Sequence, residues 1–137
     1  MAMTLTPYLT FNGNCAEAME FYKSCVGGEL EINKVGDSPV ANDMPDKKDW
    51  VMHSMLKSGG IVLMASDLMM GGEVNQGNSV TLTLSGGSLA ELTEMFNKLK
   101  EGGTVRQPLQ AAFFGTYGDL KDKYGVLWAF QSDEKSE

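Results

Sequence analysis

The feature that most constrains this chain is an internal repeat. Residues 5–28 and 80–103 follow one plan, in which an alternating strand precedes an amphipathic helix that ends at paired glycines. Three landmarks recur at a constant offset, so that Leu9, Phe21 and Gly27-Gly28 return as Leu84, Phe96 and Gly102-Gly103. Repeats of about 20–50 residues are typical of solenoids, whereas one repeat of about half the chain predicts two similar modules.

The first copy carries the local signals of a βαβββ module. Between residues 4 and 11, apolar side chains alternate with Thr and Tyr, which predicts a half-buried strand. Asn14 is the predicted N-cap of a helix, with Glu17 three positions later. That helix runs to about Val26, and Gly27-Gly28 ends it through a left-handed cap. The remaining strands of this module are predicted at 29–35, 50–57 and 61–66, with a loop at 36–49.

The second copy repeats this order. A strand at 79–85 alternates aliphatic and hydroxyl side chains, and Ser88 with Glu91 forms a capping box before a helix that ends at Gly102-Gly103. Further strands are predicted near 104–109, 112–121 and 125–131. The predicted fold is therefore α+β, with two βαβββ modules that form curved sheets around a cleft. We expect a single domain with module one at about 4–66, a linker at 67–78, module two at 79–131 and a charged tail at 132–137.

Charge and hydropathy narrow the classes of function. The net charge of the 137 residues is −7, and no cluster of Lys or Arg is present to neutralise phosphates, so we expect no nucleic-acid partner. No apolar run reaches the length of about 18 residues that a membrane span needs, and we expect no membrane partner. The first residues do not have the pattern of a signal peptide, which favours a cytoplasmic protein.

The two cysteines, Cys15 and Cys25, both fall in the first predicted helix. The helical rise separates them by about 15 Å, whereas a disulfide needs Cα atoms within about 7 Å. They cannot pair with each other, and their spacing is not that of a zinc site. We interpret them as buried structural thiols, with a reactive thiol as the alternative.

The predicted cleft would be lined by polar but uncharged side chains. Hydroxyl groups both donate and accept hydrogen bonds, so this lining suits a neutral or weakly polar small molecule. Met is abundant, with ten residues, and either fills core gaps or supplies apolar walls to such a site. The candidate ligand-binding residues are Thr6, Tyr8, Thr10, Met64, Ser79, Thr81 and Tyr117.

Five segments resemble a known family, and together they span nearly the whole chain. They are Pro7–Asn14, Ala18–Tyr22, Met52–Leu56, Leu63–Asp67 and Phe114–Trp128. In order and spacing they are similar to the vicinal oxygen chelate superfamily of glyoxalase, bleomycin-resistance and dioxygenase proteins. The closer resemblance is to its PhnB-like branch, also labelled 3-demethylubiquinone 3-methyltransferase-like. The last segment departs from the usual Asp-Pro-Phe-Gly of that branch at Lys123 and Tyr124.

The resemblance implies a metal site in the enzymatic members, with His or Glu ligands from the first, fourth, fifth and eighth strands. Aligned to this chain, those positions fall near Thr6, Met64, Ser79 and Ala129, none of which is a usual ligand of a divalent metal. We therefore predict no metal site and no cofactor. The methyltransferase label is weakly supported, because no strand is followed by a Gly-rich loop that opens a helix.

His53 is the only histidine and is a candidate general base or ligand, although a structural role is the alternative. We expect a metal-free small-molecule-binding protein, which the resemblance implies is a homodimer. One alternative is a metal-dependent lyase, isomerase or dioxygenase-like enzyme with a non-standard site of His53 and a carboxylate such as Glu73 or Asp119. A further alternative is a non-catalytic interaction module.

Overall fold

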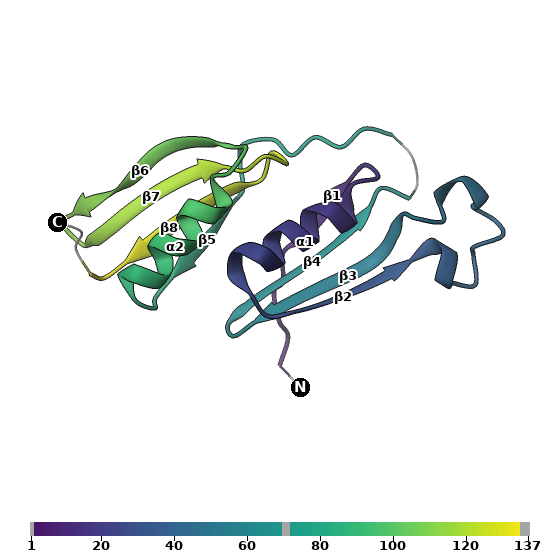
Figure 1. Ribbon diagram of the computed structural model, residues 1–137, viewed down its shortest axis with the longest axis horizontal. Helices are drawn as coiled ribbons and strands as arrows, with labels where there is room; N and C mark the ends of the chain where they lie inside the picture. The colour runs from purple at the N-terminus through teal and green to yellow at the C-terminus, as the bar shows by residue number, and fades with distance from the viewer. Residues whose placement is uncertain (1, 70–71, 135–137) are drawn as a thin grey trace. The chain divides into compact units, whose positions relative to one another are not determined.

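The computed structural model describes residues 2–69 and 72–134. The chain divides into two compact units, Met1–Asn75 and Gln76–Glu137. Each unit holds one helix and one four-stranded sheet (Figure 1). The predicted α+β fold of two βαβββ modules is confirmed.

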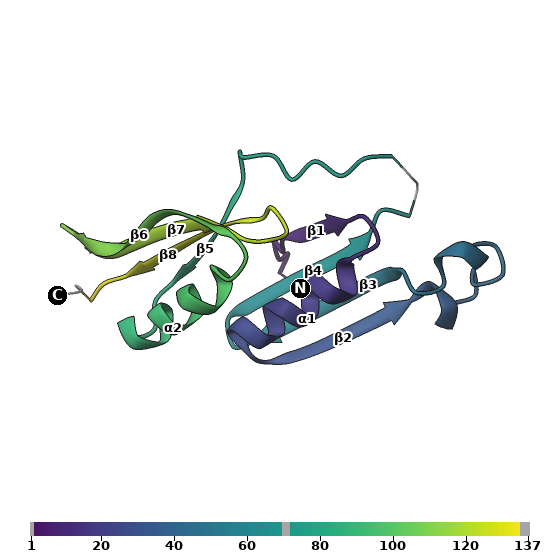
Figure 2. The ribbon, with the colours of Figure 1, turned by 45° about the horizontal axis from the view of Figure 1, so that its top comes forward.

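In the first unit, the chain order is β1 (Tyr8–Phe11), α1 (Cys15–Val26), β2 (Glu29–Lys34), β3 (Val51–Ser58) and β4 (Ile61–Asp67). The strands lie in the order β1-β4-β3-β2, with β1 parallel to β4 and the other neighbours antiparallel. Helix α1 lies along one face of this sheet (Figure 2). The predicted loop at 36–49 contains parts of two short 3₁₀ turns, Val35–Asp37 and Pro45–Lys47.

The second unit repeats that arrangement strand for strand. Its elements are β5 (Thr81–Ser85), α2 (Leu89–Leu99), β6 (Thr104–Ala112), β7 (Gly115–Lys121) and β8 (Leu127–Ser132). They lie in the order β5-β8-β7-β6, again with a parallel pair at one edge and antiparallel neighbours elsewhere. The match of order and direction confirms the repeat that the sequence indicated.

Both opening strands begin later than predicted. β1 begins at Tyr8, because Pro7 has no N–H and contributes only its carbonyl, which accepts from the Met64 N–H at 3.1 Å. Leu5, which was expected on the buried side, is 100% exposed. β5 begins at Thr81, where pairing with Leu127 of β8 starts. Thr6 and Ser79 therefore precede their strands instead of lying within them.

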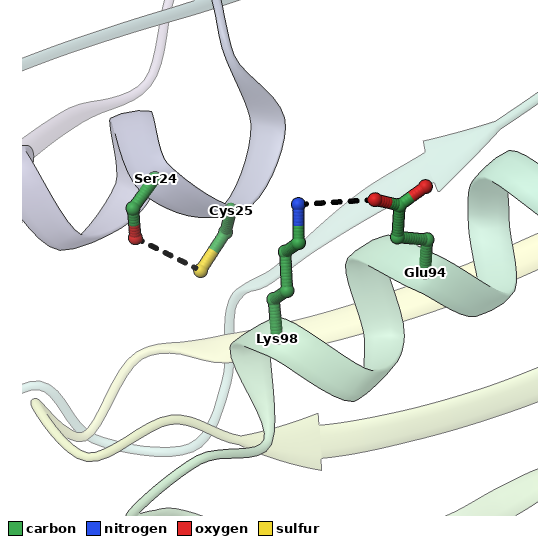
Figure 3. Close-up of polar contacts among 4 residues, drawn as sticks. All are labelled: Ser24, Cys25, Glu94 and Lys98. Atoms are coloured by element: carbon green, nitrogen blue, oxygen red, sulfur yellow. Dashed lines mark hydrogen bonds and ion pairs between the residues drawn. The ribbon is translucent and has the colours of Figure 1, made fainter.

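Each helix buries an apolar stripe against its own sheet. The stripe of α1 consists of Cys15, Ala18, Met19, Tyr22, Cys25 and Val26. From α2, Phe96 packs edge-on against Phe130 of β8, with ring centroids 5.1 Å apart. Trp128, two residues before Phe130 on β8, lies in the core at 1% exposure. On the exposed side of α2, Lys98 and Glu94 form an ion pair one turn apart (Figure 3).

The two helices are capped differently. Ser88 accepts a hydrogen bond from the Glu91 N–H, as the capping box predicted. Asn14 occupies the N-cap position of α1, but its side chain makes no capping bond. The buried carboxylate of Asp67 replaces it, since Oδ1 accepts from the N–H groups of Gly13 and Cys15. Its Oδ2 accepts from the Val51 N–H, so this one side chain joins α1, β3 and β4.

The turn between β7 and β8 is organised by Asp122. Its Oδ1 accepts from the N–H groups of Tyr124 and Val126, and its Oδ2 accepts from the indole Nε1–H of Trp128 at 2.8 Å. The Asp122 carbonyl accepts from the N–H of Gly125, which has a φ of 89°. Because these bonds use the Asp and the Gly, the departures at Lys123 and Tyr124 leave the turn intact.

Both cysteines are buried, as predicted, and neither forms a disulfide. The Cys15 Sγ lies 3.7 Å from the Ser54 hydroxyl, and burial raises the pKa of the Cys15 thiol to about 12. The Cys25 Sγ lies 4.0 Å from the hydroxyl of the adjacent Ser24 (Figure 3). A thiol with so high a pKa is a poor nucleophile, which supports the structural interpretation of Cys15.

Candidate functional site

In each unit the helix covers one face of the sheet, and we call the opposite side the open face. Alternation along each strand decides which side chains reach it. On the first sheet the open face has mostly uncharged polar and thioether side chains over β1, β3 and β4. They are Tyr8, Thr10, His53, Met55, Met64 and Ser66, all exposed or half-buried.

Tyr8 and His53 meet on this face. The Tyr8 hydroxyl lies 3.1 Å from His53 Nδ1, and the ring centroids are 5.8 Å apart. Since Tyr8 is on β1 and His53 is on β3, the contact bridges over β4, where Met64 is the direct partner of Tyr8. Tyr8 is 49% exposed, so this polar pair is open to a ligand.

Charged side chains gather at the β2 edge of the same sheet. Cross-strand pairing places Glu31 opposite Met55 and Glu29 opposite Lys57. Together with Leu30 they line a shallow depression of about 280 Å³. The open face of the first sheet is therefore uncharged over β1 and β4 and charged at the β2 edge.

On the second sheet, the open face centres on Tyr117 and Asp119 of β7. The Tyr117 hydroxyl donates to Asp119 Oδ2 at 2.9 Å. Burial, followed by the hydrogen bond to Asp119, raises the pKa of Tyr117, and the nearby charge of Arg106 acts in the opposite direction. Asp119 Oδ1 is buried without a hydrogen-bond partner. A buried acceptor left unpaired costs about 1–3 kcal/mol, and more when it is charged.

Aromatic rings extend from Tyr117 to the turn between β6 and β7. Phe114 packs edge-on to Tyr117 with centroids 6.4 Å apart, and Phe113 packs edge-on to Phe114 at 5.1 Å. Phe113 is 92% exposed and Phe114 is 39% exposed. Beside them, β6 has two irregularities in its pairing with β7, one between Val105 and Gln107 and one between Gln107 and Gln110. Such bulges bend a strand and redirect its side chains, and they are common beside binding sites.

The structure brings some of the predicted site residues together and separates others. Tyr8, Thr10 and Met64 share the open face of the first sheet, and Thr81 and Tyr117 share that of the second. Thr6 and Ser79 lie just outside β1 and β5.

Sequence reasoning missed two contacts of these faces. It found no partner for His53, because the contact with Tyr8 depends on a register that no local pattern indicates. It named Asp119 only as a possible metal ligand, without its bond to Tyr117. Alternation in β7, which puts both residues on one side, was the available signal.

The family is shown by comparison with known proteins. Residues 3–131 match the family described as 3-demethylubiquinone-9 3-methyltransferase. The chain belongs to this PhnB-like family. Protein YjdN of Escherichia coli strain K12 is 30% identical in an alignment of 139 positions, gaps included, that covers 92% of each protein.

Solved structures extend the likeness to the fold. Protein PA1353 from Pseudomonas aeruginosa is 37% identical with a TM-score of 0.86, covering 98% of this chain and 100% of that one. A putative 3-demethylubiquinone-9 3-methyltransferase, PhnB protein, from Bacillus cereus is 26% identical with a TM-score of 0.76, covering 95% and 99%. A glyoxylase/bleomycin resistance protein/dioxygenase domain from Frankia sp. EAN1pec is 16% identical with a TM-score of 0.64, covering 95% and 96%. This last likeness shows the fold alone, and it confirms the predicted superfamily fold.

The superfamily resemblance implies a metal in its enzymatic members. Whether this PhnB-like protein can hold one depends on the side chains at the corresponding strand positions. On the sheets, Met64 pairs with Tyr8 and Ala129 pairs with Thr83. A thioether, a phenol, a methyl group and a hydroxyl do not form the His and carboxylate set that a divalent metal of this kind requires. Within residues 2–69 and 72–134, no three His, Cys, Asp or Glu side chains are grouped to hold a metal. The described residues do not fit the superfamily's metal.

The alternative metal site of His53 with a carboxylate is also poorly supported. Among the described residues, the hydrogen-bond partner of His53 is Tyr8, not a carboxylate. Glu73 is exposed in the segment after β4, and the Asp119 carboxylate accepts from the Tyr117 hydroxyl. Within residues 2–69 and 72–134, no helix is both long and apolar enough to cross a membrane.

Proposed function

We propose that this PhnB-like protein binds a small organic molecule on the open faces of its sheets, without a metal. The observation that carries the proposal is the Tyr8–His53 pair, an exposed hydrogen bond that bridges β1 and β3 over β4, away from the charged side chains at the β2 edge. A solvated sheet face usually carries many charged residues. Here thioether and hydroxyl groups surround one polar pair, which is the composition of ligand sites.

The hydrogen-bonding groups of this pair are suited to orienting a ligand. A neutral imidazole has one donor and one acceptor nitrogen, and a phenol both donates and accepts. With Nδ1 engaged by Tyr8, the Nε2 of His53 and the second lone pair of the Tyr8 oxygen are the groups that a ligand can use. Met64 and Met55 supply adaptable apolar contact beside them.

The starts of the two helices do not favour the methyl transfer named in the family's description. Anionic cofactor groups commonly bind at the start of a helix. In α1 those N–H groups are engaged by the Asp67 carboxylate. In α2 they are engaged by Ser88 and by Glu134, whose Oε2 accepts from the Leu89 N–H. Both starts already hold an acceptor from the chain itself.

The test is a thermal-shift screen of small planar antibiotics and dicarbonyl compounds, followed by titration calorimetry of every compound that stabilises. A compound at 100 times its dissociation constant adds about 2.7 kcal/mol if it binds the folded state alone. We expect Tyr8→Phe and His53→Gln to weaken binding, whereas Tyr124→Phe, the same change outside the site, leaves it unaltered. Binding that is equal in all four proteins contradicts the proposal.

The alternative functions predict different results for the same purified protein. Stoichiometric zinc, nickel or iron in untagged protein, lost on His53→Ala, would establish the metal-dependent enzyme. No stabilisation by any compound class would favour an interaction module. A homodimer, which the resemblance implies, is part of the proposal and is tested by sedimentation equilibrium. A cytoplasmic location remains a prediction from the sequence, tested by cell fractionation.

A further inference from the structure

On the second sheet, the carboxylate of Asp119 has only one of its two oxygens in a hydrogen bond. Asp119 Oδ2 accepts from Tyr117, but Oδ1 is buried with no hydrogen-bond partner. Native proteins leave few buried polar atoms unpaired, and each exception calls for a group that completes it. The described residues give Asp119 no Lys or Arg within ion-pair distance, although Arg106 is near enough to affect Tyr117.

The surroundings of Asp119 define what that missing group is. Tyr117 packs against Phe114, and Phe114 packs against Phe113, which makes a row of three rings leading to the carboxylate. Two of these rings are open to solvent. A carboxylate beside aromatic faces is the chemistry that recognises organic cations, because the ring faces are negative and the oxygen accepts the N–H. The net charge of −7 also favours the approach of cations.

We infer that Asp119, Tyr117 and Phe114 form a subsite for a protonated amine or guanidinium group of a small organic ligand. Because Oδ1 is buried in the free protein, the side chains that cover it move aside when the cation donates its N–H to this atom, and the hydroxyl of Tyr117 holds the carboxylate in place through Oδ2. The ring of Phe114 contacts the organic part of the ligand. No bond is made or broken. This inference rests on the proposed small-molecule function and specifies the class of ligand.

The experiment compares three probes that share one skeleton and differ in charge. They are 2-phenylethylamine, which is protonated at pH 7, neutral 2-phenylethanol and anionic phenylacetate, with dissociation constants measured by ligand-observed NMR titration. We expect the amine to bind at least about tenfold more tightly than the alcohol, since a charged hydrogen bond is the stronger one. Equal binding of amine and alcohol overturns the inference.

The variants are matched in charge. Asp119→Asn removes the charge while keeping the shape, and Glu101→Gln makes the same change at an exposed position of the same unit. We expect Asp119→Asn to weaken amine binding about tenfold or more, and Glu101→Gln to leave it within about twofold. Equal losses in both variants would show a general effect of charge and overturn the subsite. Phe114→Leu should weaken the amine most, because leucine keeps the apolar contact but lacks the negative ring face, and unchanged amine binding would contradict the role of this ring.

A second readout does not depend on any ligand. If Oδ1 awaits an external donor, removing its charge relieves a cost in the free protein, so free Asp119→Asn melts at or above the wild-type temperature. A clearly lower melting temperature would mean that the fold already satisfies Asp119. Amine binding that is normal in Asp119→Asn would overturn this inference and leave the proposed function standing, because that function is tested separately at Tyr8 and His53.

Discussion

Replacing Asp67 with alanine should destabilise the first unit severely, because one side chain accepts three backbone N–H groups. Two of the donors belong to Cys15 and Val51, which are both 0% exposed. Each orphaned buried donor costs about 1–3 kcal/mol, so the pair costs about 2–6 kcal/mol. The third donor, Gly13, is exposed and can turn to water. Typical domains unfold at about 5–15 kcal/mol, so the loss is a large part of the total.

Asparagine at the same position separates the hydrogen bonds from the shape of the side chain. Its single carbonyl oxygen can still accept from Gly13 and Cys15, but its NH₂ group then faces the Val51 N–H. One buried donor is lost, and so is the negative charge at the start of α1, which adds about 0.3–1 kcal/mol. Asp67→Asn should therefore cost about 1–4 kcal/mol, less than alanine.

The assay is urea denaturation followed by far-UV circular dichroism, with free energies compared at a common slope. Asp49→Ala, an exposed acid just before β3, is the matched control and should stay within about 0.5 kcal/mol of wild type. A loss below about 1 kcal/mol for Asp67→Ala would refute the reasoning. So would an asparagine variant as stable as the wild type.

Three further predictions concern a helix cap, a buried thiol and a turn, and their free energies of unfolding are measured in the same urea assay. Ser88→Ala should cost about 1 kcal/mol and Asn14→Ala only a few tenths, because only Ser88 makes a capping bond; equal losses would contradict this. The Cys15 thiol should react with a disulfide reagent at pH 8 only on unfolding. Burial raises the pKa of the Cys15 thiol to about 12 in the folded protein, so above about pH 9 the thiol loses its proton more readily in the unfolded chain. The free energy of unfolding should therefore fall as pH rises above about 9, and this fall should be smaller in Cys15→Ala. Lys123→Pro should stabilise by about 0.4–1 kcal/mol, because it follows Asp122 in a turn closed by the Gly125 N–H; a loss would mean an unsuitable backbone angle.

Local signals were sufficient for the elements of the fold. The Ser88 box and the period of each helix depend on neighbours in sequence. The paired glycines were a weaker guide: Gly27 caps α1 with a φ of 77° but a ψ of −161°, which is not the predicted left-handed conformation, and α2 ends at Leu99, before Gly102-Gly103. Such signals are physical properties of short segments, so they survive without knowledge of the partner strands.

Contacts between distant segments were beyond these signals. Asn14 has the right residue type for a cap, yet Asp67 displaces it because the end of β4 lies beside the start of α1. Residues 4–7 alternate like a strand, but Pro7 has no N–H and the pairing with β4 starts only at Tyr8 and Met64. The Tyr8–His53 contact likewise requires the order β1-β4-β3, which alternation alone does not reveal.

The repeat accounts for the backbone of this protein and not for its chemistry. In each unit a tyrosine hydroxyl on the open face bonds to a titratable side chain, His53 in the first and Asp119 in the second. The strands differ, however, because Tyr8 and His53 come from β1 and β3, whereas Tyr117 and Asp119 both come from β7. Each polar pair therefore belongs to its own unit, and the side chains that form it did not follow the repeated backbone from one unit to the other.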